Sequence, residues 1–197
     1  MTVTLRSLMG DDLAAALPAI ARLRTEVFRD WPYLYEGDAD YEELYLAALA
    51  AARDAVIVGA FDGDVMVGAA TACPLAEADA AFQKPFRDAG IDVGEWFYFG
   101  ESVLEQPYRG RGIGVRFFRE REAAARKRLF ARCCFCAVAR APDDPRRRAD
   151  YEPLDGFWNR RGYRPLGLTA LYAWRDLGQE RETAKAMRFW GRTLPTV

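Results

Sequence analysis

The chain has 197 residues and a mass of 22.2 kDa, which is the size of one domain. Hydrophobic residues make up 51% and charged residues 29%, a globular balance that argues against a disordered chain. The chain has no histidine, which excludes Ser-His-Asp and Cys-His catalysis, His-ligated zinc and His proton shuttles. The net charge of -1 also makes it no obvious nucleic-acid binder.

The N-terminal part predicts a strand followed by two helices. Residues 3–8 alternate in polarity and favour an opening strand. Apolar residues at helical spacing predict an amphipathic helix over 11–30, with Asp11 or Asp12 as its N-cap. The Ala- and Leu-rich residues 40–54 predict a second helix.

The middle of the chain predicts a hairpin and a long strand. Residues 56–61 and 65–73 flank Asp62-Gly63-Asp64, and an Asp-Gly turn between apolar runs is typical of a β-hairpin. Residues 77–89 predict a helix. Residues 94–105 predict a long strand with Gly100 at a bulge.

The C-terminal part alternates helices and strands. The expected elements are a helix to about 129, a strand over 131–139, a loop over 141–156, a short helix over 157–161 capped by Gly162, and strands over 168–175 and 184–192. The order of elements predicts an α/β fold: a single domain over residues 1–197, with a mixed, mostly antiparallel sheet flanked by helices.

Targeting and cysteine patterns point to a cytoplasmic protein. The first residues lack a signal peptide's basic start, and no apolar run approaches the roughly 20 residues that span a bilayer, so no membrane partner is expected. Cys133, Cys134 and Cys136 share one short run without CxxC spacing, and Cys73 stands apart. We expect core thiols, without a disulfide framework or a metal site.

A basic segment surrounds a glycine-rich turn. Residues 106–148 hold 13 Lys or Arg and 4 Asp or Glu, a balance of +9, so the remaining residues carry -10. Within this segment, Arg109-Gly110-Arg111-Gly112-Ile113-Gly114 lies between a strand and a helix. Glycines expose backbone N–H groups, and a helix N-terminus and arginines add positive charge, so this turn predicts a phosphate site. The Gly-Lys-Ser/Thr of a Walker loop and the GxGxxG of a dinucleotide fold are absent.

The turn resembles the signature of the GNAT superfamily of acyl-CoA N-acyltransferases: Gln or Arg, two residues, Gly, one residue, then Gly or Ala. Arg109, Gly112 and Gly114 match it in register. The resemblance covers about residues 95–129 best and extends more weakly to residues 157–166.

The resemblance implies that acetyl-CoA is the co-substrate and that no metal takes part. Arg109 to Gly114 would cradle the pyrophosphate through backbone amides. The preceding strand would splay from its neighbour, so that Val103 and Leu104 pair with the pantetheine arm. Arg116, Lys127 and the arginines at 146–148 are the cations that suit the adenosine 3′-phosphate.

Acyl transfer to an amine needs a base, and without histidine a carboxylate is the natural choice. Glu101 is the first candidate, since apolar neighbours Phe97, Phe99 and Val103 would disfavour its ionised form and make it more basic. Glu95 and Glu105 are alternatives on the same strand.

The family often supplies an acid from a tyrosine four residues before the glycine of its later motif. Trp158 occupies that position, and an indole N–H has no practical acidity. Water could supply the proton instead, as could Tyr108, Tyr151 or Tyr163. Of the three tyrosines, we expect Tyr151 to be the acid.

In this family the first two helices, their connection and the late strands generally bind the acceptor. That implies Trp31, Tyr33 and Tyr35 as substrate-binding residues, near the acids Glu36, Asp38 and Asp40. Residues 80–90 could add a further wall.

The function expected is N-acetyltransfer from acetyl-CoA to a primary amine of a small molecule or a protein, by direct attack on the thioester. The alternative is a non-catalytic acyl-CoA-binding sensor or regulatory domain. The sequence leaves the oligomeric state open and allows a homodimer.

Overall fold

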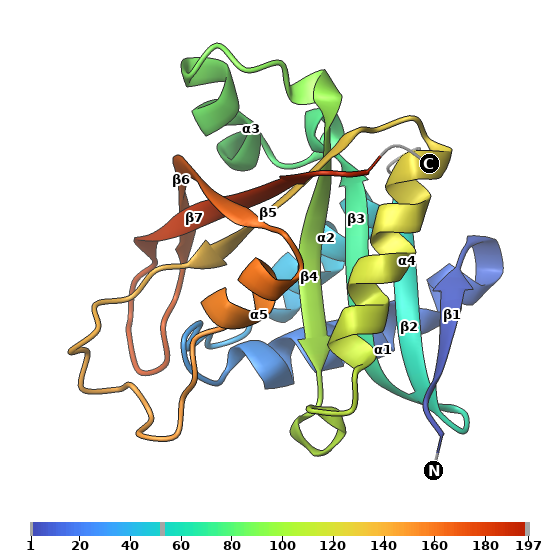
Figure 1. Ribbon diagram of the computed structural model, residues 1–197. Helices are drawn as coiled ribbons and strands as arrows, with labels where there is room; N and C mark the ends of the chain where they lie inside the picture. The colour runs from blue at the N-terminus through green and yellow to red at the C-terminus, as the bar shows by residue number, and fades with distance from the viewer. Residues whose placement is uncertain (1, 52–53, 196–197) are drawn as a thin grey trace.

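A seven-stranded mixed sheet runs through the computed structural model, which describes residues 2–51 and 54–195 (Figure 1). In the described residues the strand order is β1-β2-β3-β4-β5-β7-β6, and every neighbouring pair is antiparallel except β4 and β5. The strands are β1 (Thr4–Leu8), β2 (Val56–Asp62), β3 (Val65–Pro74), β4 (Trp96–Leu104), β5 (Arg132–Val138), β6 (Arg164–Trp174) and β7 (Thr183–Thr193).

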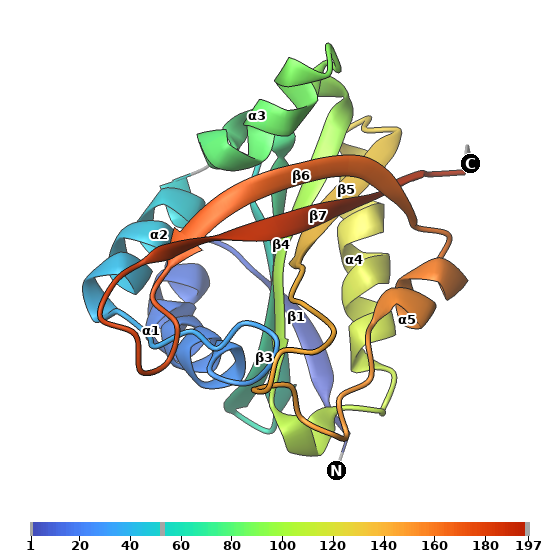
Figure 2. The same ribbon diagram turned by 90° about the vertical axis from the view of Figure 1, so that its left-hand side faces the viewer.

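Helices cover both faces of this sheet. Figure 2 shows α1 and α2 on one side and α4 and α5 on the other, with α3 at one end beside β6. The α-helices are α1 (Gly10–Phe28), α2 (Ala39–Ala51), α3 (Ala80–Asp88), α4 (Ile113–Lys127) and α5 (Asp155–Arg160). Short 3₁₀ turns, η1 (Leu75–Glu77), η2 (Val93–Glu95) and η3 (Gln106–Tyr108), join strands to helices. The predicted fold class and element order are confirmed.

Three predicted boundaries were wrong for local reasons. Met9 is the N-cap of α1, and Asp11 and Asp12 lie in its first turn, where their charges still suit the positive end of the helix. Helix α3 begins at Ala80 because the Asp79 side chain accepts a hydrogen bond from the Ala81 N–H and caps it. Strand β6 begins four residues early, at Arg164, and is an edge strand, where a proline such as Pro165 is tolerated.

The core lies between the sheet and its helices. Phe97 and Phe99 of β4 pack with Phe118 of α4, while Tyr98 between them belongs to the aromatic cluster on the opposite face. All four cysteines are buried free thiols, as predicted. Successive side chains of β4 therefore point to opposite faces of the sheet, one packed against α4 and the other against the aromatic cluster of Tyr98.

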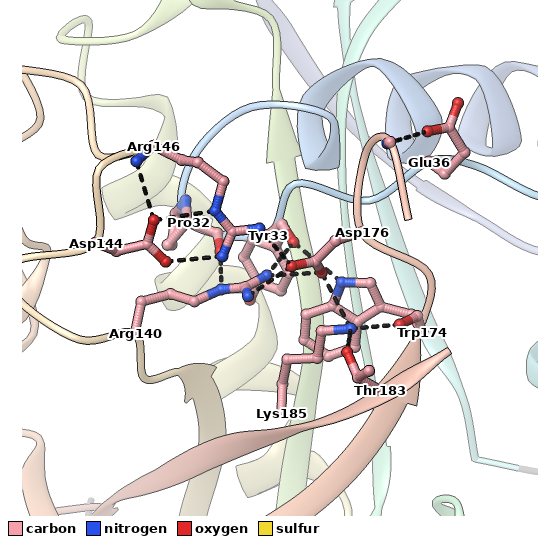
Figure 3. Close-up of polar contacts among 11 residues, drawn as sticks. Pro32, Tyr33, Glu36, Arg140, Asp144, Arg146, Trp174, Asp176, Thr183 and Lys185 are labelled. Carbon is pink, nitrogen blue, oxygen red and sulfur yellow. Dashed lines mark hydrogen bonds and ion pairs between the residues drawn. The ribbon is translucent and has the colours of Figure 1, made fainter. Parts of the chain in front are cut away.

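An ionic cluster ties the aromatic segment after α1 to the β6–β7 hairpin (Figure 3). We call it the Asp176 cluster: Asp176, Arg140, Arg146, Asp144 and Lys185. Arg140 binds both carboxylate oxygens of Asp176, at 2.8 and 2.9 Å, and also donates to the carbonyls of Pro32 and Tyr33. Lys185 and Arg146 reach the same carboxylate at 3.0 and 2.9 Å. Tyr33 is thereby held against β6.

Candidate active site

The sheet opens in its middle, where β4 leaves β5. The two strands pair in parallel only from Trp96 to Tyr98 on β4 and from Arg132 to Cys134 on β5. Both strands continue beyond that point, β4 to Leu104 and β5 to Val138. The splay implied by the sequence resemblance is therefore present, and it starts next to Gly100.

A β-bulge at Gly100 and Glu101 directs the Glu101 side chain. On β3, Ala70 pairs with Ser102 and Ala72 with Phe99, so Thr71 alone opposes the two residues. The extra residue shifts the alternation of β4, so that Glu101 shares the face of Tyr98 instead of that of Phe99. A Cβ on Gly100 would lie 2.5 Å from Thr71 Oγ1, so only glycine fits. The predicted bulge is confirmed, and its effect is to turn Glu101 towards α1 and α2.

Arg121 of α4 holds the bulge from the other face. Its guanidinium donates to the carbonyl oxygens of Thr71 and Glu101, at 3.3 and 3.4 Å, and to Ser102 Oγ at 2.8 Å. The Glu101 N–H in turn donates to Thr71 Oγ1 at 3.2 Å. Burial lowers the pKa of Arg121 to about 10, so this side chain stays charged near neutral pH.

Glu101 belongs to a buried cluster whose negative charges outnumber its positive charge. We call Glu101, Arg24, Glu42 and Tyr45 the Glu101 cluster. Arg24 contacts Glu42 Oε2 at 2.5 Å and Glu101 Oε2 at 3.1 Å, and the Tyr45 hydroxyl donates to Glu101 Oε2 at 2.6 Å. One guanidinium therefore serves two carboxylates, which leaves a net charge of one negative unit.

The other oxygen of Glu101 is free. Glu101 is 7% exposed, and its Oε1 has no hydrogen-bond partner among the described residues. Buried carboxylate oxygens are normally satisfied, so this atom is available to a ligand. The predicted apolar surround was wrong in part, because the bulge puts Phe97 and Phe99 on the opposite face and Arg24 beside Glu101.

A pocket of about 190 Å³ opens above the Glu101 cluster. Aromatic residues are the largest group in its lining: Phe28, Tyr33, Tyr35, Tyr41, Tyr45, Phe82, Tyr98, Tyr172 and Trp174. Three further acids, Asp38, Glu180 and Glu182, line it and are exposed. The pocket thus combines apolar walls with a carboxylate floor and an acidic mouth.

Four elements, α2, α3, β4 and β6, wall the pocket through stacked and hydrogen-bonded rings. Phe82 of α3 stacks on Tyr98 at 5.3 Å and on Tyr172 at 4.9 Å between ring centroids. The hydroxyls of Tyr41 and Tyr172 are 2.6 Å apart, which links α2 to β6. Residues 80–90, expected as a further wall, contribute Phe82.

Two of the three substrate-binding residues expected from the sequence, Tyr33 and Tyr35, line the pocket with Glu101. The third, Trp31, lies outside its lining, and so does Tyr151, the candidate acid. The Trp31 and Tyr151 rings contact each other edge to face at 6.1 Å. Burial raises the pKa of Tyr151, which makes it a poorer proton donor.

The other carboxylates and tyrosines considered as acids or bases are engaged elsewhere. Glu105 pairs with Arg22, and Glu95 pairs with Arg132. Tyr108 donates to Asp62 and Tyr163 to Glu122. Trp158 packs between Phe135 and Trp190. None of these residues lines the pocket.

The glycine-rich turn lies at the N-terminus of α4. Gly112 is the N-cap, with φ +77°, no side chain caps the helix, and its first turn holds no acid. A Cβ on Gly110 or Gly112 would meet no atom within 4 Å, so the backbone here faces open space. The Ile113 side chain is buried, which leaves only its backbone for a ligand. The turn is built as an anion site.

The charged and apolar neighbours of this turn have distinct positions. Arg109 Nε donates to the Leu104 carbonyl at 3.1 Å, and Arg111 lies over the Tyr108 ring. The Val103 side chain is buried in the cluster formed with α1, so only its backbone can face the splay. Gly114 follows in the first turn of α4, where an added Cβ would only touch Phe157.

Part of the basic excess of residues 106–148 is engaged in ion pairs within the protein. Arg146 pairs with Asp144 and Asp176, and Arg148 pairs with Asp30 and Asp150. Lys127 ends α4, about 20 Å from its first turn at 1.5 Å per residue. Of the cations named for a 3′-phosphate, Arg116 is the one close to the turn, and it donates to the Val3 carbonyl.

Sequence reasoning missed Arg24, Glu42, Tyr45 and Tyr98. The clearest available indication was Arg24, which interrupts the apolar stripe of Ile20, Leu23 and Val27 on α1. A charged residue on a core-facing stripe needs a buried partner.

Solved structures with the same architecture identify the fold. A ribosomal-protein-alanine N-acetyltransferase from Brucella melitensis aligns with a TM-score of 0.62 and 16% identity, over 97% of this chain and 99% of that one. A GCN5-related N-acetyltransferase from Kribbella flavida aligns with a TM-score of 0.62 and 16% identity, over 98% of each chain. This chain has the GNAT fold.

A third GNAT structure, an aminoglycoside 6′-N-acetyltransferase complexed with coenzyme A, aligns with a TM-score of 0.62 and 14% identity, over 100% of this chain and 99% of that one. No family model and no curated protein matches the sequence. Within residues 2–51 and 54–195, no group of three or more acidic, Cys or His side chains could hold a metal ion. No helix in this part of the GNAT domain is long and apolar enough to cross a membrane.

Proposed function

We propose that this GNAT domain is an acetyl-CoA-dependent N-acetyltransferase that acetylates a primary amine by direct attack on the thioester. One observation carries the proposal: Glu101, whose Oε1 has no partner among the described residues, lines the pocket at the point where β4 leaves β5. The GNAT structures with similar architecture are N-acetyltransferases, and one is complexed with coenzyme A, which supports the assignment.

The residues of the turn suit the coenzyme's phosphates. The uncapped N-terminus of α4 offers N–H groups, and Gly110 and Gly112 leave open space in front of them. Arg109 and Arg111 add charge at the same turn. Acetyl-CoA supplies the activated acyl group, and the backbone of β4 beyond Gly100 would run beside its pantetheine arm.

Glu101 acts as the base. An ammonium has no lone pair, so the amine must first give a proton to Glu101 Oε1. The free amine then attacks the thioester carbonyl carbon, and the carbon–sulfur bond breaks. The attacking nitrogen loses its second proton through water to the departing sulfur, which leaves as the thiol, and the proton on Glu101 returns to solvent. Burial raises the pKa of Tyr98, and burial also raises that of Tyr33, so water is the better source of a proton for the thiolate.

The test measures coenzyme binding and turnover separately. Purified protein is titrated with acetyl-CoA by calorimetry, and release of free thiol is followed with a panel of primary amines. We expect binding, and turnover with at least one amine. Tight binding without turnover on any amine would favour the sensor or regulatory alternative.

A glycine pair tests the phosphate site. Gly112→Glu places a carboxylate at the N-terminus of α4 and should abolish acetyl-CoA binding. Gly90→Glu is the matched control, because Gly90 also has a positive φ, +70°, with nothing within 4 Å of an added Cβ, but follows α3. Equal affinity in both variants would remove the turn from the coenzyme site.

A further inference from the structure

We infer that the acceptor is a primary amine joined by a short chain to a flat apolar ring, with its ammonium on Glu101 Oε1. This inference rests on the proposed function and adds the acceptor class. Three independent features support it: the charge of the floor, the size and walls of the pocket, and the position of its acids.

The Glu101 cluster leaves one carboxylate oxygen without a cationic partner. Arg24 is 6% exposed, and its guanidinium already serves both Glu42 and Glu101. Arg121, the other buried cation near Glu101, donates to its backbone carbonyl from the opposite face of β4 and leaves Oε1 unpaired. Buried charges are stable when they are paired, so an ammonium at Oε1 supplies the missing partner, which a neutral or anionic ligand does not.

The size and walls of the pocket fit a single ring. A cavity of about 150 Å³ lined by apolar side chains takes up benzene. A pocket of about 190 Å³ therefore holds one ring with a short aminoalkyl chain. Aromatic rings supply much of its wall, among them the stack of Tyr98, Phe82 and Tyr172.

The acids of the pocket are arranged for one ammonium inside. Among the described lining residues, Glu101 is the buried carboxylate, while Asp38, Glu180 and Glu182 are exposed. The exposed acids attract cations to the mouth, an effect that salt screens. Glu101 Oε1 is therefore the one buried carboxylate oxygen without a partner among the described lining residues, and it takes one ammonium.

Binding is measured without coenzyme, so that it does not depend on turnover. Calorimetry compares 2-phenylethylamine with 2-phenylethanol, which keeps the ring and loses the charge, and with spermidine, which keeps charge and loses the ring. We expect 2-phenylethylamine to bind at least about tenfold more tightly than either, since a charge-assisted hydrogen bond and a ring contact each contribute on that scale. Equal binding of 2-phenylethanol, or tighter binding of spermidine or of a lysine peptide, would overturn the inference.

Two variants locate the ammonium. Glu101→Gln keeps the side-chain size and should reduce 2-phenylethylamine affinity at least about tenfold while leaving 2-phenylethanol unchanged. Glu182→Gln removes a charge at the mouth and should weaken binding by less, with a loss that salt abolishes. An equal loss in both variants would move the ammonium from the floor to the mouth.

Turnover separates this inference from the proposed function. If 2-phenylethylamine binds as expected but no amine releases thiol, the proposed activity is wrong, while the inferred chemical class of the bound amine is retained. If spermidine or a peptide is acetylated in preference to 2-phenylethylamine, the activity stands and the acceptor class is wrong.

Discussion

The Asp176 cluster and the Glu101 cluster are built from the same groups and differ in one respect. In the first, both carboxylate oxygens of Asp176 accept from two cationic side chains each. In the second, one oxygen of Glu101 accepts from Arg24 and Tyr45, and the other has no partner among the described residues. The saturated cluster fixes segments of the chain to one another, and the unsaturated one is available to a ligand.

The charge balance of the two clusters follows the same division. Three cations surround two carboxylates in the Asp176 cluster. Removing its central carboxylate therefore leaves positively charged side chains without a partner. In the Glu101 cluster two carboxylates share one cation, so removing Glu101 leaves a balanced Arg24–Glu42 pair. Opposite effects on stability and activity are therefore expected from matched substitutions.

Asp176→Asn should give the largest loss of stability. Asp176 is 4% exposed, and the change leaves Arg140 and Lys185 without their carboxylate. Breaking a buried pair in this way costs about 3 to 5 kcal/mol of unfolding free energy. Denaturant unfolding measures it, with the exposed Asp150→Asn as control, for which we expect a change below about 1 kcal/mol. Similar values for both would show that the Asp176 cluster does not hold the fold.

Glu101→Gln should lower turnover with little change in stability. Loss of a general base costs about 100-fold or more in kcat. Acetyl-CoA affinity and the unfolding midpoint should stay close to those of the wild type. Glu105→Gln, on a glutamate that follows the same strand and pairs with Arg22, is the control. Unchanged kcat in Glu101→Gln would remove this residue from the mechanism.

Gly100→Ala should disturb the bulge and so change the direction of the Glu101 side chain. Its Cβ would lie 2.5 Å from Thr71 Oγ1, and overpacking of this kind costs about 1 to 3 kcal/mol. We expect kcat to fall more than acetyl-CoA affinity. Adding Thr71→Ala removes the clashing atom, so the double variant should be more stable than the sum of the single losses predicts. Strict additivity would mean that the two side chains do not interact.

The pH dependence of stability should show the smallest effect. Burial favours a higher pKa for Asp176, but hydrogen bonds from Arg140, Lys185 and Arg146 outweigh it and lower the pKa to about 2. The carboxylate of a group with a depressed pKa stabilises the fold above its ordinary pKa of 3.8 and loses this effect as the pH falls towards 2. The stability gap between wild type and Asp176→Asn should therefore narrow from pH 4 to pH 2, and a constant gap would contradict the assignment.

Local patterns in the sequence predicted much of the fold. The Asp62-Gly63-Asp64 turn, the glycine-rich turn before α4 and the bulge at Gly100 depend on backbone preferences of a few adjacent residues. The choice of Glu101 followed from its place in the strand ahead of the glycine-rich turn and from the absence of histidine.

The pairings within the two clusters could not be predicted in the same way. Arg24, Glu42 and Glu101 come from α1, α2 and β4, and only the folded sheet brings them together. In the irregular residues 31–38 no periodicity indicates which ring faces inward, so Trp31 could not be separated from Tyr33. The surroundings of Glu101 were wrong in part, because Phe97 and Phe99 would share its face under regular alternation and the bulge interrupts that alternation.

The bulge in β4 makes the direction of the Glu101 side chain depend on the number of residues in a single strand. Deleting Glu101, one codon in its gene, would leave Gly100 alone opposite Thr71, restore regular alternation and keep the apolar pattern up to Phe99. Such a chain could still bury its core and keep its glycine-rich turn, but no carboxylate would lie at the floor of the pocket. A catalytic domain of this design is one deletion away from a descendant that binds without reacting.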